Sequence, residues 1–220
     1  MGRSWSIVWT GAALAVLTGC ATVEQRGPAA VSTPPSVLPV YYTGLSGECP
    51  VLKSTEAKRF TGARVGNRTR TPKPTSRFER IDCDWYPSSG VAPWVVVAIT
   101  IFLEPSTAQQ MAESAFTQAR DYDTGRAKAD SSHAIQATES TTPNGPAYVV
   151  VDASGDGLTA DMDQLWQGTR IGNTLVTVTL FEKLDAGAHG SARADKLMTE
   201  LSATSQSITA EIAGQLVPRA

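Results

Sequence analysis

Two stretches of this chain between residues 77 and 103 have hydrophobic patterns typical of β-strands. Residues 77–87 alternate, with Ile81, Cys83 and Trp85 on one side, which predicts a half-buried strand. Residues 94–103 are nearly all apolar and β-branched, as in a central strand. The polar turn between the two runs favours a hairpin.

More strands are predicted after residue 130. Residues 133–140 have the weak pattern of an edge strand, and residues 147–152 have the pattern of a buried one. Residues 163–183 contain two further runs, which meet near Gly172-Asn173, a typical hairpin turn. In the last run, the residues expected on one face are Val176, Val178 and Leu180, and those on the other are Leu175, Thr177, Thr179 and Phe181.

Helical periods separate these strands. A short helix is expected to end near Thr61, and a longer one covers residues 105–122. The apolar face of the longer helix is predicted to hold Met111, Ala115, Phe116, Ala119 and Tyr122. A final helix over about 191–216 carries the stripe Leu197, Leu201, Ile208, Ile212 and Leu216. Runs of adjacent strands with interspersed helices indicate a mainly antiparallel α+β domain over residues 47–218.

The first 19 residues have the anatomy of an export signal. Arg3 provides a positive start, and residues 5–17 are almost entirely apolar or small. A helix of about 13 residues spans about 20 Å, against about 30 Å of bilayer hydrocarbon. This segment is therefore too short for a stable transmembrane helix.

Residues 17–20, Leu-Thr-Gly-Cys, end the apolar run. They resemble a bacterial lipobox, which implies cleavage before Cys20 and acylation of its sulfur and new amine. Two or three acyl chains hold a protein on a bilayer almost permanently. The alternative is an ordinary signal peptide followed by a chance cysteine. We expect a lipoprotein, exported and anchored through Cys20 at the outer face of the cytoplasmic membrane.

Residues 20–46 follow as a lipid anchor and flexible tether. They are rich in Pro, Ser, Thr and Ala, and they lack a helical or strand period.

Cys49 and Cys83 are the remaining two of the three cysteines in the chain. Two cysteines in an exported chain indicate a structural disulfide. Closing a loop of about 35 residues would stabilise the fold by about 3–4 kcal/mol. A metal pair or a reactive thiol is the alternative.

The net charge and the absence of common catalytic motifs limit the functions expected of this protein. The formal net charge is -2, so we expect no general attraction to nucleic acid. No HExxH, CxxC, P-loop or GxGxxG pattern occurs, and only two histidines are present. We therefore expect no cofactor and no catalytic site.

Residues 152–163 imitate the spacing of a calcium loop. Oxygen ligands would come from Asp152, Ser154, Asp156 and Asp163. A strand enters this stretch where an EF-hand requires a helix. A polar hairpin loop explains the same composition without an ion.

A basic segment covers residues 58–80, which contain eight basic residues and one acid, Glu79. This segment is either a surface that contacts anionic lipid headgroups or wall polymers, or a solvated loop.

Three tryptophans are candidates for a ligand cleft: Trp85, Trp94 and Trp166. The alternative is that they belong to the core.

The order of these features resembles small actinobacterial cell-surface lipoproteins. The residues that carry the resemblance are Leu17 to Cys20, Cys49, the Cys83-Asp84-Trp85 run and Trp166. The order of elements is also similar to the PsbP/Mog1-like sandwich and to the extracellular sensor domains of mycobacterial serine/threonine kinases. Those sensor domains commonly have two disulfides, whereas one is expected here.

The sequence favours a non-catalytic, membrane-anchored envelope protein. Its domain would bind another envelope protein or a small apolar or wall-derived ligand. One alternative is a cell-wall-acting enzyme whose site only the fold assembles. Another is a structural or assembly subunit of an envelope complex.

Overall fold

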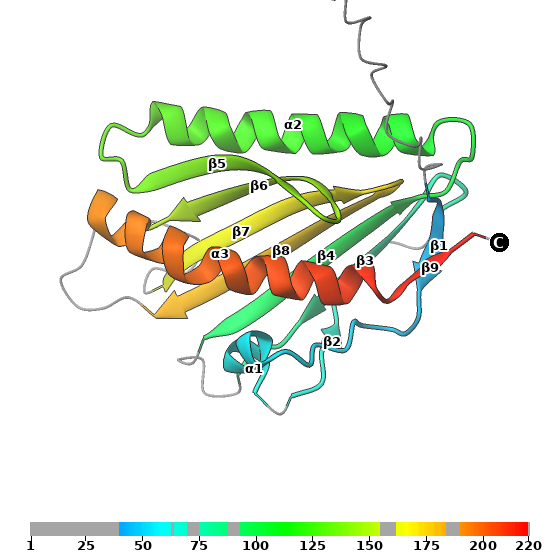
Figure 1. The fold of residues 1–220 in the computed structure, drawn as a ribbon, viewed down its shortest axis with the longest axis horizontal. Coiled ribbons are helices and arrows are strands. Elements are labelled where there is room, and N and C mark those ends of the chain that lie inside the picture. Colours follow the sequence, from blue (N-terminus) through cyan, green and yellow to red (C-terminus); the bar gives the residue numbers. More distant parts are fainter. Residues whose placement is uncertain are drawn as a thin grey trace, which may run out of the picture. The chain divides into compact units, whose positions relative to one another are not determined.

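The computed structural model describes residues 40–62, 64–69, 75–87, 93–154, 162–183 and 190–219. Within them it forms an α+β domain (Figure 1). The helices are α1 (Thr55–Thr61), α2 (Ala108–Ala129) and α3 (Ser191–Ala213). The strands are β1 (Tyr42–Leu45), β2 (Asn67–Arg68), β3 (Phe78–Asp84), β4 (Trp94–Phe102), β5 (Ile135–Thr142), β6 (Gly145–Asp152), β7 (Met162–Ile171), β8 (Thr174–Lys183) and β9 (Leu216–Pro218).

The main sheet has seven strands in the order β2-β3-β4-β8-β7-β6-β5. Every neighbouring pair is antiparallel. The β3–β4 and β7–β8 hairpins and the edge position of β5 agree with the sequence patterns. The predicted fold class is therefore confirmed.

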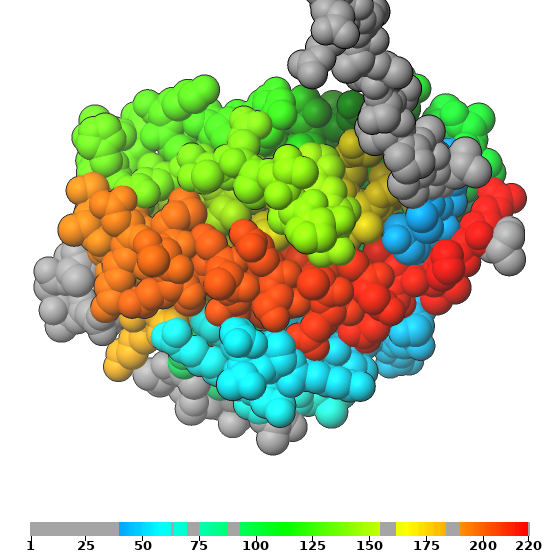
Figure 2. Space-filling view, viewed as in Figure 1, coloured from blue at the N-terminus to red at the C-terminus, as the bar shows by residue number. Residues whose placement is uncertain are grey.

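One face of the sheet carries the main core. α3 and α1 pack here against alternate residues of the strands, including Val97, Val151 and Val178. Val176, Val178 and Leu180 are fully buried on this side, as their spacing predicted. Figure 2 shows α3 and the short α1 segment side by side on this face.

The opposite face is covered by α2. The inward side of α2 includes Ala112 and Phe116, which pack against two smaller apolar clusters. Phe116 meets Tyr148 of β6 with the ring centroids 5.6 Å apart. α2 extends seven residues beyond the predicted end at 122, and Tyr122 is exposed rather than on the packed face.

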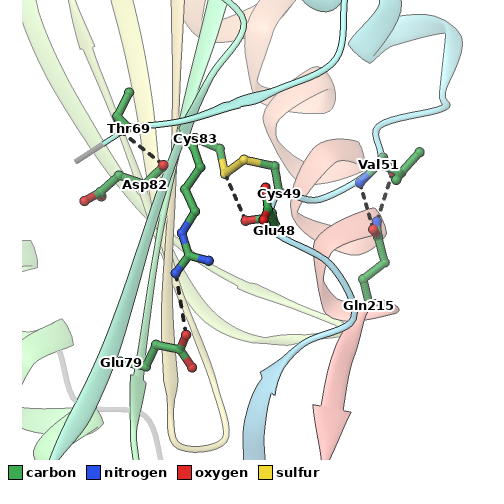
Figure 3. Close-up of a disulfide and its surroundings, with 9 residues drawn as sticks. Glu48, Cys49, Val51, Thr69, Glu79, Asp82, Cys83 and Gln215 are labelled. Atoms are coloured by element: carbon green, nitrogen blue, oxygen red, sulfur yellow. Dashed lines mark hydrogen bonds and ion pairs between the residues drawn. A yellow bond between two sulfur atoms is a disulfide. The ribbon is translucent and has the colours of Figure 1, made fainter. Parts of the chain in front are cut away.

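A disulfide joins Cys49, in the segment before α1, to Cys83 of β3, with the Cα atoms 5.9 Å apart. The predicted bridge is therefore confirmed (Figure 3). Gln215, just after α3, fixes the same segment: Val51 N–H donates to Gln215 Oε1 at 2.8 Å, and Gln215 Nε2 donates to Val51 O at 3.0 Å.

The folded chain begins before residue 47, in part of the predicted tether. β1 pairs with β9 in a separate two-stranded sheet. Asn173, in the β7–β8 turn, fixes β1: Tyr42 N–H donates to its Oδ1 at 2.7 Å, and its Nδ2 donates to Tyr42 O at 2.9 Å. Leu216 lies in β9 instead of the final helix, which ends at Ala213.

Candidate functional site

A cavity of about 730 Å³ lies between the last turns of α2 and the sheet. The first turns of α2 pack near Phe102 at one end of β4, whereas Phe116 packs over β6. The helix therefore crosses the sheet obliquely. Near the other end of the strands it leaves Val96, Thr179 and Phe181 half-exposed as one wall of the cavity.

The apolar part of the cavity is largely aromatic. Trp166 of β7 and Phe181 of β8 both line it. Behind Phe181, Trp94 stacks at a centroid distance of 4.5 Å and an interplanar angle of 15°. Tyr86 meets Trp94 edge-on at 4.9 Å. Rings fixed in this way present a rigid wall to a ligand.

Two carboxylates and one guanidinium surround Trp166. The indole Nε1–H of Trp166 donates to Asp123 Oδ2 at 2.9 Å. The guanidinium of Arg126 lies 5.6 Å from the centroid of the Trp166 ring, and its Nη2 is 3.2 Å from Asp152 Oδ2. Asp152 also accepts hydrogen bonds from the backbone N–H and hydroxyl of Ser154.

The pKa of Tyr148, below this network, is raised because the phenol is buried and lies beside the charge of Asp123. Tyr148 therefore stays protonated at neutral pH.

Asp130 provides a third carboxylate just after α2. It accepts hydrogen bonds from the hydroxyl and backbone N–H of Ser132 and from the backbone N–H of Ile135. These donors, the Ser132 hydroxyl first, lower the pKa of Asp130 from 3.8 to about 2. The lining thus holds three carboxylates and one guanidinium, and its field is negative.

Of the three predicted cleft tryptophans, only Trp166 lines this cavity. Trp94 is buried behind Phe181. Trp85 belongs to the core on the α3 side, where an added Cβ on Gly66 would lie 2.5 Å from its ring. The structure therefore does not place the three rings in one cleft, because Trp85 faces the opposite side of the sheet.

The structure does not bring the calcium-loop candidates together. Asp152 pairs with Arg126 of α2, whereas Asp163 pairs with Arg193 of α3 at 2.7 Å. The two carboxylates therefore lie on opposite faces of the sheet. Ser154 hydrogen-bonds to Asp152, and Asp156 lies outside the described residues. Among the described residues, no group of three or more His, Cys, Asp or Glu is placed to hold a metal.

Several arginines of the basic segment are paired within the domain, which weakens its positive field. Arg64 donates to the carbonyls of Phe60 and Thr61. Ion pairs join Arg59 to Glu182, Arg68 to Glu79 and Arg80 to Asp82. Arg70 and Lys73 lie outside the described residues.

The sequence patterns missed the polar half of the cavity. Asp123, Arg126 and Asp130 continue the inward face of α2 beyond Phe116 and Ala119 at helical spacing. The signal for these residues in the sequence is the presence of polar side chains on the helical face that packs on the sheet. A helix that ends near residue 122, as expected from the sequence, does not include them.

Comparison with known proteins identified no matching family model, curated protein or solved structure. Within the described ranges, none of the helices has the length and apolar character needed to cross a bilayer.

Proposed function

We propose that this protein is an exported, lipid-anchored envelope protein whose domain binds a small ligand without transforming it. Export and anchoring are supported by the apolar run that ends at Leu-Thr-Gly-Cys, with Cys20 as the acylated residue. The disulfide is consistent with an oxidising compartment outside the cytoplasm. On the sequence resemblance, we propose that the chain is similar to small actinobacterial cell-surface lipoproteins and that its domain is similar to the PsbP/Mog1-like sandwich and to kinase extracellular sensor domains.

The cavity beside α2 is the observation that carries the binding proposal. Its volume of about 730 Å³ lies within the range of about 300–1,000 Å³ for small-molecule sites. Such sites combine an apolar wall with a few oriented polar groups. Trp166 and Phe181 provide the wall here, and Asp123, Arg126 and Asp152 provide the polar groups.

Two ionisable groups at or near the cavity are poorly matched to acid–base catalysis at neutral pH. A general acid or base works best when its pKa is close to the working pH. The pKa of Asp130 is lowered to about 2, and that of Tyr148 is raised. Neither group exchanges a proton readily at neutral pH.

β1 is attached to the domain at a point distant from the cavity. Tyr42 is held at the β7–β8 turn by Asn173, whereas Phe181 lies near the other end of β8. The seven residue steps from Thr174 to Phe181 span roughly 24 Å. β1 therefore lies far from the cavity.

A fragment screen by ligand-observed NMR tests the binding site. Val96→Trp fills the cavity, and Val217→Trp makes the same change on the partly exposed β9. Fragments should bind the wild type and the Val217→Trp variant and lose binding to Val96→Trp. Fragments that bind all three proteins equally, or none of them, would contradict the proposal.

A further inference from the structure

We propose that the cavity selects small organic cations with an apolar body, and that Arg126 occupies the cation position until a ligand displaces it. This inference rests on the proposed function, because it names the class of ligand for the same cavity. Three independent features support it: the charge of the lining, the position of Arg126 and the aromatic wall.

The charge of the lining favours a positive ligand. Asp123, Asp130 and Asp152 are opposed within the lining by Arg126 alone. Asp123 and Asp152 are also largely buried, with 9% and 4% of their surface exposed. Carboxylates that are largely buried beside a cavity act through a medium of lower dielectric than water, so they attract cations and repel anions more strongly there.

The position of Arg126 indicates which chemical group the cavity can bind. Its guanidinium lies against the Trp166 ring and the Asp152 carboxylate at the same time. A cation held between an aromatic face and a carboxylate is a common way in which proteins recognise ammonium and guanidinium groups. The Arg126 side chain is nevertheless 38% exposed, and its long flexible stem allows the guanidinium to move into solvent.

The apolar wall of the cavity indicates the chemistry of the uncharged part of the ligand. Phe181, Val96 and Ile135 line the cavity together with Trp166, so they can cover an aromatic or aliphatic body. A ligand whose charged group meets Asp152 and Trp166 would take the place of the Arg126 guanidinium, because two cations on one ring repel each other. The expected class is an amine or guanidine carried on a short hydrophobic group.

Matched probes test this assignment on the full-length lipoprotein in phosphatidylcholine nanodiscs. 3-Phenylpropylamine, 3-phenyl-1-propanol and 3-phenylpropanoate have the same body and differ in charge. Isothermal titration should give at least tenfold tighter binding of the amine than of the alcohol, and the weakest binding for the carboxylate. The Val96→Trp variant corrects for partition of the probes into the bilayer.

Variants of α2 test the role of Arg126. Arg126→Gln should bind the amine several-fold more tightly than the wild type, since it removes the resident cation. Arg120→Gln makes the same change on the β5 side of the helix, where Arg120 pairs with Asp121 and Glu139, and should bind like the wild type. Asp152→Asn should weaken binding of the amine.

A readout on the wild type does not depend on how well the variants fold. The indole N–H resonance of Trp166 should shift on addition of the amine and stay in place with the carboxylate.

The possible outcomes separate the two proposals. Tighter binding of the carboxylate, with loss of binding in Arg126→Gln, would make Arg126 an anion anchor and overturn the ligand class while the cavity stands as a binding site. Equal binding of the amine and the alcohol would also overturn the class alone. If none of the three probes distinguishes the wild type from Val96→Trp, both the ligand class and the proposed cavity function are contradicted.

Discussion

Asn173 illustrates how one side chain can fix the beginning of a domain. It is 1% exposed, and its amide bonds to both backbone groups of Tyr42 and to the carbonyl of Phe102 at 2.6 Å. The adjacent Gly172 has a φ of 58°, and an added Cβ there would lie 2.3 Å from Val40 O. This turn therefore needs both residues.

Replacement of Asn173 should destabilise the protein strongly. In Asn173→Ala, the part-buried backbone groups of Tyr42 and the buried carbonyl of Phe102 lose their partner, and the loss of a buried partner costs about 1–3 kcal/mol. We expect the free energy of unfolding to fall by about 2–4 kcal/mol in a urea titration. A loss below about 0.5 kcal/mol would contradict this role.

Asp130 gives a residue-scale prediction about pH. Its pKa is lower in the folded protein, about 2, than its usual value of 3.8. Its contribution to stability is therefore present above about pH 4 and is lost as the pH falls toward 2. Between these values the wild type should lose more stability than Asp130→Asn, as measured by thermal melts at each pH. Parallel pH profiles for the two proteins would show that Asp130 makes no such contribution.

At the scale of elements, a polar network fixes α3 on the sheet. Ser205 Oγ donates to Gln167 Oε1 at 2.7 Å, and Gln167 Nε2 donates to Thr169 and Thr209. Both Gln167 and Ser205 are completely buried. A satisfied polar network within an apolar core favours one position of the helix over others.

Loss of one residue of this hydrogen-bond network should lower the free energy of unfolding. Ser205→Ala leaves Gln167 Oε1 without its donor, so we expect a loss of about 1–3 kcal/mol in chemical denaturation. Ser207→Ala, at a half-buried position on the same helix, is the control and should change stability by less than about 0.5 kcal/mol. Equal effects of the two substitutions would count against the network.

Elements with a strong period were predictable from the sequence, and elements held by distant contacts were not. β8 follows from its alternation, because a buried sheet face imposes that period on a strand. β4 follows from its continuous apolar run, which is typical of a central strand. β1 was missed because its place depends on Asn173, more than a hundred residues away. Trp85 and Trp94 both have strand spacing, but the position of Trp85 on the other side of the sheet follows only from the paired register of β3 and β4.

For the candidate site, the sequence indicated Trp166 and Asp152 but not their relation. Trp166 and Asp152 line the same cavity because β6 and β7 pair. Asp123 and Arg126 join them because α2 continues far enough along the sheet. No local motif records such a meeting of a helix with two strands.

At the scale of the whole molecule, the proposed lipid anchor at Cys20 would determine where the domain lies. We propose that acyl chains on Cys20 attach the protein to the membrane. Cys20→Ala should therefore abolish incorporation of labelled palmitate and move the protein from the membrane fraction to the soluble fraction. A Cys49→Ala/Cys83→Ala double variant is the matched control and should still incorporate the label. Unchanged fractionation of Cys20→Ala would require another mode of attachment.

The most direct test of the account is native mass spectrometry of the full-length protein, extracted with mild detergent from the membranes of a bacterial expression host. We predict an acylated chain that carries a non-covalent small molecule, and we predict that Val96→Trp lacks this molecule while Val217→Trp retains it. An acylated chain without any small molecule in all three proteins would contradict the claim that the cavity beside α2 is a ligand-binding site.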